Sequence, residues 1–83
     1  RLPASLETEI TEAYRQTEQW CADIYRSLTD TEQAEINGTV LAALPAETRA
    51  LLPQNDPEAQ RAFVRERNRL LLDRLSRSAE RTS

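Results

Sequence analysis

Several residue types are missing or scarce in this chain of 83 residues, and each absence narrows what it can do. There is no histidine and no lysine, and Cys21 is the only cysteine. An intramolecular disulfide is therefore impossible, and a four-ligand zinc site lacks nitrogen and sulfur donors. Nucleophilic catalysis needs a base to activate the nucleophile, and the commonest base is absent. We predict no catalytic residue, no metal site and no cofactor, and we expect a binding protein rather than an enzyme.

Glycine is almost absent as well, because Gly38 is the only one. Tight β-hairpins rely on glycine or Asn-Gly between runs in which apolar and polar residues alternate. Asn37-Gly38 is such a dipeptide, but its flanks do not alternate and are typical of helix. The scarcity of glycine predicts an all-α fold without a sheet. The longest apolar run, Leu70-Leu71-Leu72, is far shorter than a membrane span, so we expect no membrane contact.

The composition also indicates in which cellular compartment and in what kind of organism the protein occurs. The free thiol of Cys21 and the lack of a secretory leader indicate a reducing cytoplasm. All eleven basic residues are arginine, which is typical of a GC-rich, bacterial genome. The start at Arg1 indicates that the natural chain has residues before it. A domain of this length has a small core, and neither a disulfide nor a metal can stabilise it, so we expect a homodimer.

Three start signals indicate where the helices begin. Ser5 follows the extended Leu2-Pro3 and can cap a first helix. Thr29 and Glu32 have the spacing of a capping box. Asp56-Pro57-Glu58 combines a capping side chain, a first-position proline and an acid in the first turn. We predict a single helical domain over residues 1–83, with helices at about 5–28, 30–44 (followed by extra turns at 46–52) and 57–78, and a frayed tail at 79–83.

The apolar residues of the first predicted helix recur at steps of three and four. Leu6, Ile10, Tyr14, Cys21 and Leu28 consequently share one stripe. Cysteine without a disulfide is among the most buried residue types, so we expect Cys21 to be a small core residue. The predicted architecture is a three-helix up-down bundle, or a helical hairpin with a short bent middle helix.

Charge is distributed unevenly along the chain. Residues 1–60 hold four arginines and eleven acids, a net charge of −7, whereas residues 61–83 hold seven arginines and three acids, a net charge of +4. Arginines of a basic helix can bind phosphates. However, the whole chain is acidic, and the arginines at 61, 65, 67, 69 and 74 point in several directions on a helix. We expect them to pair with acids of the first helix, within one chain or between two, and keep a nucleic-acid accessory role as the alternative.

Candidate partner-binding residues follow from composition. Tyrosine, tryptophan and arginine are the residues most often found at binding hot spots, and a small core leaves some rings for a second chain to cover. Ordinary core packing is the competing interpretation, most of all for Phe63. Asn68 lies near the seam of the last helix, where a buried asparagine can fix the register of a helix pair. The candidates are Tyr14, Trp20, Tyr25, Phe63, Arg65, Arg69 and Leu70.

The segment Leu6-Glu7-Thr8-Glu9-Ile10-Thr11-Glu12-Ala13-Tyr14-Arg15 follows Leu2-Pro3. It resembles the start of the first long helix in TraM-type anti-activators, which are small helical bacterial proteins that bind and silence LuxR-type quorum-sensing transcription factors. The resemblance implies a protein that dimerises through long helices and covers a regulator's surface. We therefore predict a regulatory protein that sequesters a protein partner. A small helical chaperone or adaptor of a secretion or phage assembly system is a further alternative.

Overall fold

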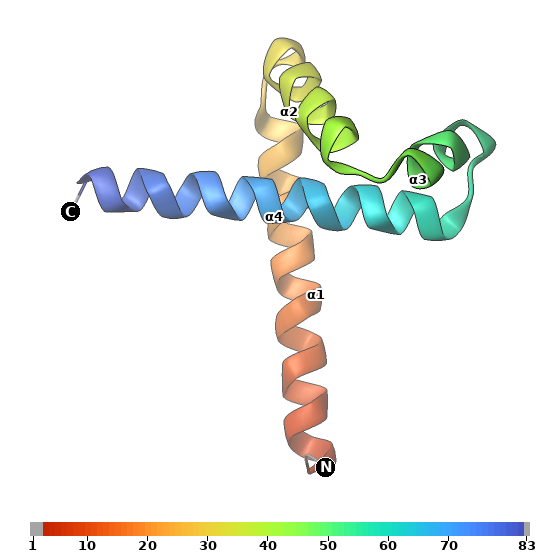
Figure 1. Ribbon diagram of the computed structural model, residues 1–83. Coiled ribbons are helices and arrows are strands. Elements are labelled where there is room, and N and C mark those ends of the chain that lie inside the picture. The colour runs from red at the N-terminus through yellow and green to blue at the C-terminus, as the bar shows by residue number, and fades with distance from the viewer. Residues whose placement is uncertain (1–2, 83) are drawn as a thin grey trace.

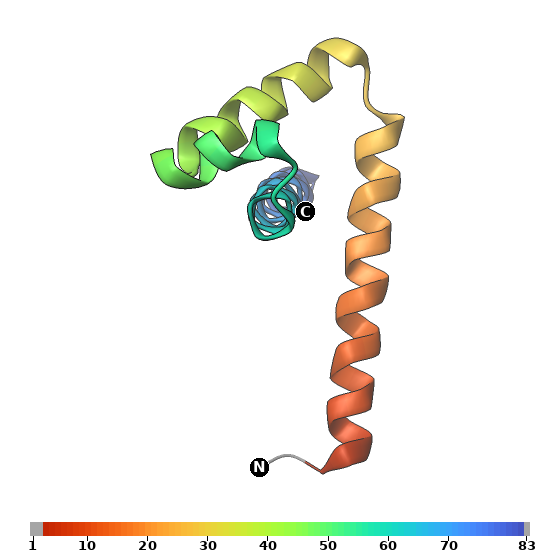
Figure 2. The same cartoon turned by 90° about the vertical axis from the view of Figure 1, so that its right-hand side faces the viewer.

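The structure is a computed structural model that describes residues 3–82. Within this range the chain is helical and has no strand, which confirms the all-α prediction (Figure 1). The three-helix up-down bundle is not confirmed, because residues 3–82 form four α-helices and the two long ones cross instead of running side by side (Figures 1 and 2). The elements are α1 (Ala4–Ser27), α2 (Asp30–Ala43), α3 (Ala46–Leu51), the 3₁₀ turn η1 (Leu52–Gln54) and α4 (Pro57–Thr82).

Two of the predicted helix starts are confirmed by hydrogen bonds. The Thr29 hydroxyl accepts a bond from the Glu32 backbone N–H at 3.1 Å, and the Glu32 carboxylate accepts one from the Thr29 N–H at 2.9 Å. This is the predicted capping box at the start of α2. At the start of α4, the Asp56 carboxylate accepts a bond from the Ala59 N–H at 3.0 Å. The first helix differs, since Pro3 rather than Ser5 occupies the cap position and no side chain caps it.

The remaining boundaries agree with prediction at Pro45 and differ from it at the end of the last helix. Pro45 ends α2 and serves as the cap position of α3, so it separates two helices. The last helix continues to Thr82, beyond the expected end at Ser78, and Arg77 pairs with Asp73 one turn earlier at 3.2 Å. Residue 83 of the expected frayed tail lies outside the described residues.

The core lies between α2, α4 and the C-terminal half of α1, with α2 packed on α4 (Figure 2). Cys21 is fully buried there, as predicted, and burial raises the pKa of its thiol. Half-buried side chains from α1 and α4, Phe63 and Leu70 among them, pack around this cluster. The buried members of the cluster are Cys21, Ile36, Val40, Leu44 and Leu71.

The N-terminal part of α1 extends past α4 and has no other helix beside it (Figures 1 and 2). We call residues 4–20 the α1 arm. None of its side chains is buried. The resulting open shape is reflected in a Cα radius of gyration of 15.1 Å, whereas a compact domain of this length has about 12 Å. None of the helices in the described range is long and apolar enough to span a membrane.

Candidate functional site

A groove of about 870 Å³ occupies the corner between the α1 arm and the N-terminal half of α4. The crossing of the two helices creates this corner, because it separates their N-terminal halves (Figure 1). Residues at steps of three and four on α4 form one wall, and the arm forms the other. The lining includes Tyr14, Thr17 and Glu18 of α1 and Arg61, Val64, Arg65, Asn68, Arg69 and Leu72 of α4.

The apolar stripe of α1 has two different environments. In its C-terminal half Cys21 is buried, and Ile24 and Leu28 pack against the core. In the arm, the stripe continues through Ile10 and Tyr14, which are exposed. Tyr14 has 70% of its surface exposed, although it belongs to the same face as Cys21. One helix face is thus covered by the chain at one end and left without cover at the other.

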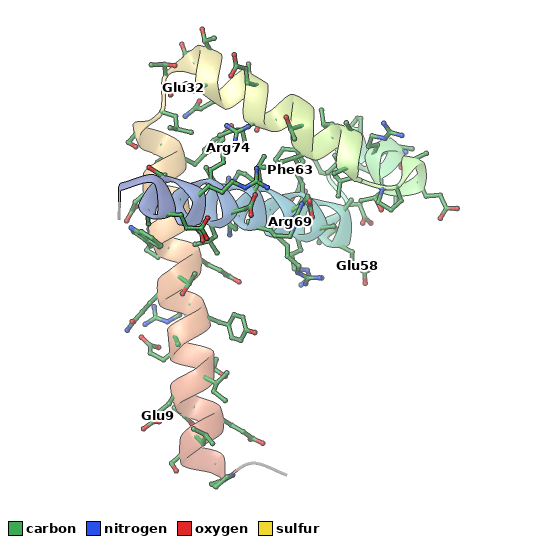
Figure 3. All side chains as sticks on the ribbon, turned by 60° about the vertical axis from the view of Figure 1, so that its left-hand side comes forward. Glu9, Glu32, Glu58, Phe63, Arg69 and Arg74 are labelled. Carbon is green, nitrogen blue, oxygen red and sulfur yellow. The ribbon has the colours of Figure 1, made fainter. Side chains whose placement is uncertain are left out.

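The groove has a basic rim that the sequence did not lead us to expect. Arg61, Arg65 and Arg69 are spaced four apart and line the same groove. The remaining arginines of that set diverge, as expected: Arg67 stacks over the Tyr25 ring at 4.6 Å from its centroid, and Arg74 lies between α4 and α2 (Figure 3). Three of the five therefore form a basic stripe along one wall.

The rim arginines differ in how they are paired. Arg69 pairs with Glu66 of its own helix, which raises the pKa of Arg69 and lowers that of Glu66. No ion pair within the described residues holds Arg61 or Arg65. Arg69 and Arg77 pair within α4 rather than with acids of the first helix, which corrects our expectation, because the crossing places most of the arm's acids away from α4. The two unpaired guanidinium groups leave positive charge available at the groove.

The seven predicted partner-binding residues fall into three groups. Tyr14, Arg65 and Arg69 come together at the groove. Trp20 lies on α1 outside the groove lining, with 51% of its surface exposed. The other three are half-buried and pack around the core: Tyr25, Phe63 and Leu70.

Internal contacts explain why those three side chains face inward. The Tyr25 hydroxyl donates a 2.9 Å hydrogen bond to the Asn37 side-chain oxygen, which ties α1 to α2. Phe63 lies on the side of α4 that faces α2 (Figure 3). Leu70 packs around the same cluster. These residues hold the helices together, and a direct role for them in partner binding stays a prediction.

Several residues that line the groove were not among the candidates. Arg61, Val64 and Leu72 belong to the α4 wall, and Asn68 is buried between them and the core. The Asn68 side-chain oxygen accepts hydrogen bonds from the Arg67 guanidinium at 3.1 and 3.3 Å. The four-residue spacing of Arg61, Arg65 and Arg69 is the sequence signal that could have identified this wall.

The groove offers binding chemistry. Burial raises the pKa of the Cys21 thiol, so the neutral form dominates near neutral pH and the sulfur is a poor nucleophile. In the part of the chain that the structure describes, no three or more acid, cysteine or histidine side chains are grouped to hold a metal ion. An apolar strip with guanidinium groups beside it suits an amphipathic helix that carries acids at the edges of its apolar face.

Comparisons with known proteins do not identify a partner helix for this groove. The comparisons do not test the similarity of residues 6–15 to TraM-type anti-activators, which therefore stays a prediction. Searches against protein-family models, curated proteins and solved structures find no match to this chain.

Proposed function

We propose that this chain is a small, non-enzymatic regulatory protein that sequesters a protein partner. The uncovered half of the α1 stripe, beside the arginine-lined groove, is the observation that carries the proposal. A soluble monomer normally covers such a stripe with its own chain, and an exposed one marks an interaction site. Partner binding would cover Ile10 and Tyr14 and bring acids to Arg61 and Arg65.

The partner we favour is a transcription factor of the LuxR type in a bacterial cytoplasm. This choice rests on the resemblance of residues 6–15 to TraM-type anti-activators and on a groove of the kind that accepts helices. Occupying a helical surface of the regulator would prevent its dimerisation or its contact with DNA. The apolar contacts would supply affinity, and the arginines would raise the association rate and select acidic partners.

The proposal is tested by affinity capture from the native cell lysate, followed by titration of the purified pair. The lysate is treated with nuclease and washed at two salt concentrations, and the retained proteins are identified by mass spectrometry. We expect one transcription factor to be retained at high salt. Tyr14→Ser should raise its dissociation constant about 30-fold, since loss of a hot-spot tyrosine costs about 2 kcal/mol. The control Leu51→Ser alters an exposed leucine of α3 outside the groove lining and should leave binding unchanged.

A nucleic-acid accessory role is the second candidate, and the alignment of Arg61, Arg65 and Arg69 along one groove favours it. It predicts capture that is abolished by nuclease, and affinity for nucleic acid that falls steeply with salt. Replacing Arg61 and Arg65 with glutamine would then reduce the slope of log K against log salt by about 2. Retention of a protein that is insensitive to nuclease and salt would rule this candidate out.

A further inference from the structure

The surface of this chain is too large for a compact monomer of its mass. Its accessible surface is 6490 Å², whereas folded monomers of this mass expose about 5,000 Å². The excess of about 1,400 Å² is larger than the roughly 800 Å² that each partner buries in a standard protein interface. Twice the excess lies within the range of total area that obligate homodimers bury. The α1 arm contributes to this excess, because none of its side chains is buried.

The arm and the α4 wall of the groove have opposite charge. The arm carries a single arginine, Arg15, among its acids, and Arg15 pairs with Glu12. Glu9 points away from every other helix (Figure 3). The groove wall on α4 carries Arg61 and Arg65, which no ion pair within residues 3–82 holds. The acids of the arm are Glu7, Glu9, Glu12 and Glu18.

The apolar surfaces of the two sites also match. Leu6 and Ile10 lie one turn apart on the exposed part of the α1 stripe. The groove presents Tyr14 and Val64, which are exposed apolar side chains. The α1 arm is therefore an amphipathic helix with acids beside its apolar face, which is the kind of ligand that the groove suits.

We propose that the groove binds the α1 arm of a second copy of this chain, and that the two copies exchange arms reciprocally about a two-fold axis. Leu6 and Ile10 of each copy cover Tyr14 and Val64 of the other. The arm acids lie beside Arg61 and Arg65 across the interface. This arrangement uses the same surface patch on both copies, as a closed two-fold dimer requires, and it covers both orphan surfaces at once. The purified chain alone tests it, so its failure is distinguishable from failure of the proposed partner.

The experiment measures molar mass by light scattering and sedimentation across a range of protein concentrations. We expect the wild-type chain to have twice the monomer mass of 9.5 kDa. Two charge-reversed proteins are then compared: a groove variant with Arg61→Glu and Arg65→Glu, and an arm variant with Glu7→Arg and Glu9→Arg. Each places like charges at both contacts of its own dimer, and we expect its dissociation constant to rise at least about tenfold.

Mixing the two variants provides the decisive comparison. In a mixed dimer, one contact joins the reversed arm to the reversed groove, and the other joins two wild-type sites. The mixture should therefore form a dimer of nearly wild-type affinity although neither variant does so alone. The matched controls are Arg49→Glu and Glu47→Arg on α3, which lie outside the groove lining and should dimerise like the wild type.

Three outcomes overturn the proposal. The first is a wild-type chain that remains a monomer at the highest concentration tested. The second is a dimer that both reversed variants form as well as the wild type, which would place the interface on another face. The third is a mixture of helical, folded variants, verified by circular dichroism, that does not associate.

Discussion

Leu71 and Leu75 lie one turn apart on α4, yet they should respond very differently to truncation. Leu71 is 4% exposed and packs in the buried cluster with Cys21 and Val40, whereas Leu75 is 38% exposed. Leu71→Ala removes three buried carbon atoms and leaves a cavity, which costs about 2–5 kcal/mol. Leu75→Ala removes atoms that are already partly in water, and we expect a cost of about 1 kcal/mol.

The core of this chain is small, so the larger loss should be easy to measure. A domain of this length has a free energy of unfolding of about 4–12 kcal/mol, and the transition midpoint falls by about 4–8 °C for each kcal/mol lost. We expect Leu71→Ala to lower Tm by at least about 8 °C. Urea unfolding followed by circular dichroism gives the same comparison, at one protein concentration because self-association stabilises the folded chain.

A matched variant separates packing from other effects. Leu71→Met keeps most of the side-chain volume and should cost less than about 1.5 kcal/mol. The reasoning fails if Leu75→Ala destabilises as much as Leu71→Ala, because α4 would then turn a different face to the core. Leu71→Asp should prevent folding altogether, since it would bury a charge without a partner.

Three further predictions concern local sites. Gly38→Ala should raise the free energy of unfolding by about 1 kcal/mol, because Gly38 lies within α2 and a Cβ there would meet nothing within 4 Å; a loss in urea unfolding would contradict this. The pKa of Glu32 is lowered by its hydrogen bond from the Thr29 backbone N–H, so its contribution to stability is present above the unfolded pKa of about 4.3 and is lost as the pH falls. Glu32→Gln should flatten this acid-side decline in unfolding experiments between about pH 5 and 3. Burial raises the pKa of the Cys21 thiol, so stability should decline above about pH 8.5, and this decline should be absent in Cys21→Ala.

Sequence signals located the starts of α2 and α4 because capping is a local interaction. Thr29 and Glu32 make the predicted reciprocal hydrogen bonds, and Asp56 caps the last helix as its side-chain chemistry predicts. The crossing of α1 and α4 could not be predicted in the same way. A stripe of apolar residues identifies which face of a helix is apolar, but it does not say how far along the helix another element covers that face.

The candidate site also could not be predicted fully from the apolar stripe of α1. Tyr14 and Tyr25 are eleven residues apart on one face of α1, so residue type and helical spacing predict the same role for both. Tyr14 is exposed at the groove, whereas Tyr25 is held in the core by Asn37 and Arg67. Only the position where α4 crosses α1 separates the two roles. In contrast, the alignment of Arg61 with Arg65 was available from their spacing and was obscured by considering Arg67 and Arg74 with them.

The two proposals together lead to a test of how they are coupled. If the arm of a second copy and the helix of a protein partner bind the same groove, they compete, and partner binding has to displace an arm. Free grooves are then scarce in the dimer, and the apparent affinity for the partner is reduced in proportion to the fraction that is free. The arm variant with Glu7→Arg and Glu9→Arg weakens the dimer and leaves the groove lining intact. It should therefore bind an acidic partner helix more tightly than the wild type at protein concentrations where the wild type is dimeric. Unchanged or weaker binding by this variant would show that the partner contacts Glu7 and Glu9 themselves or binds another surface.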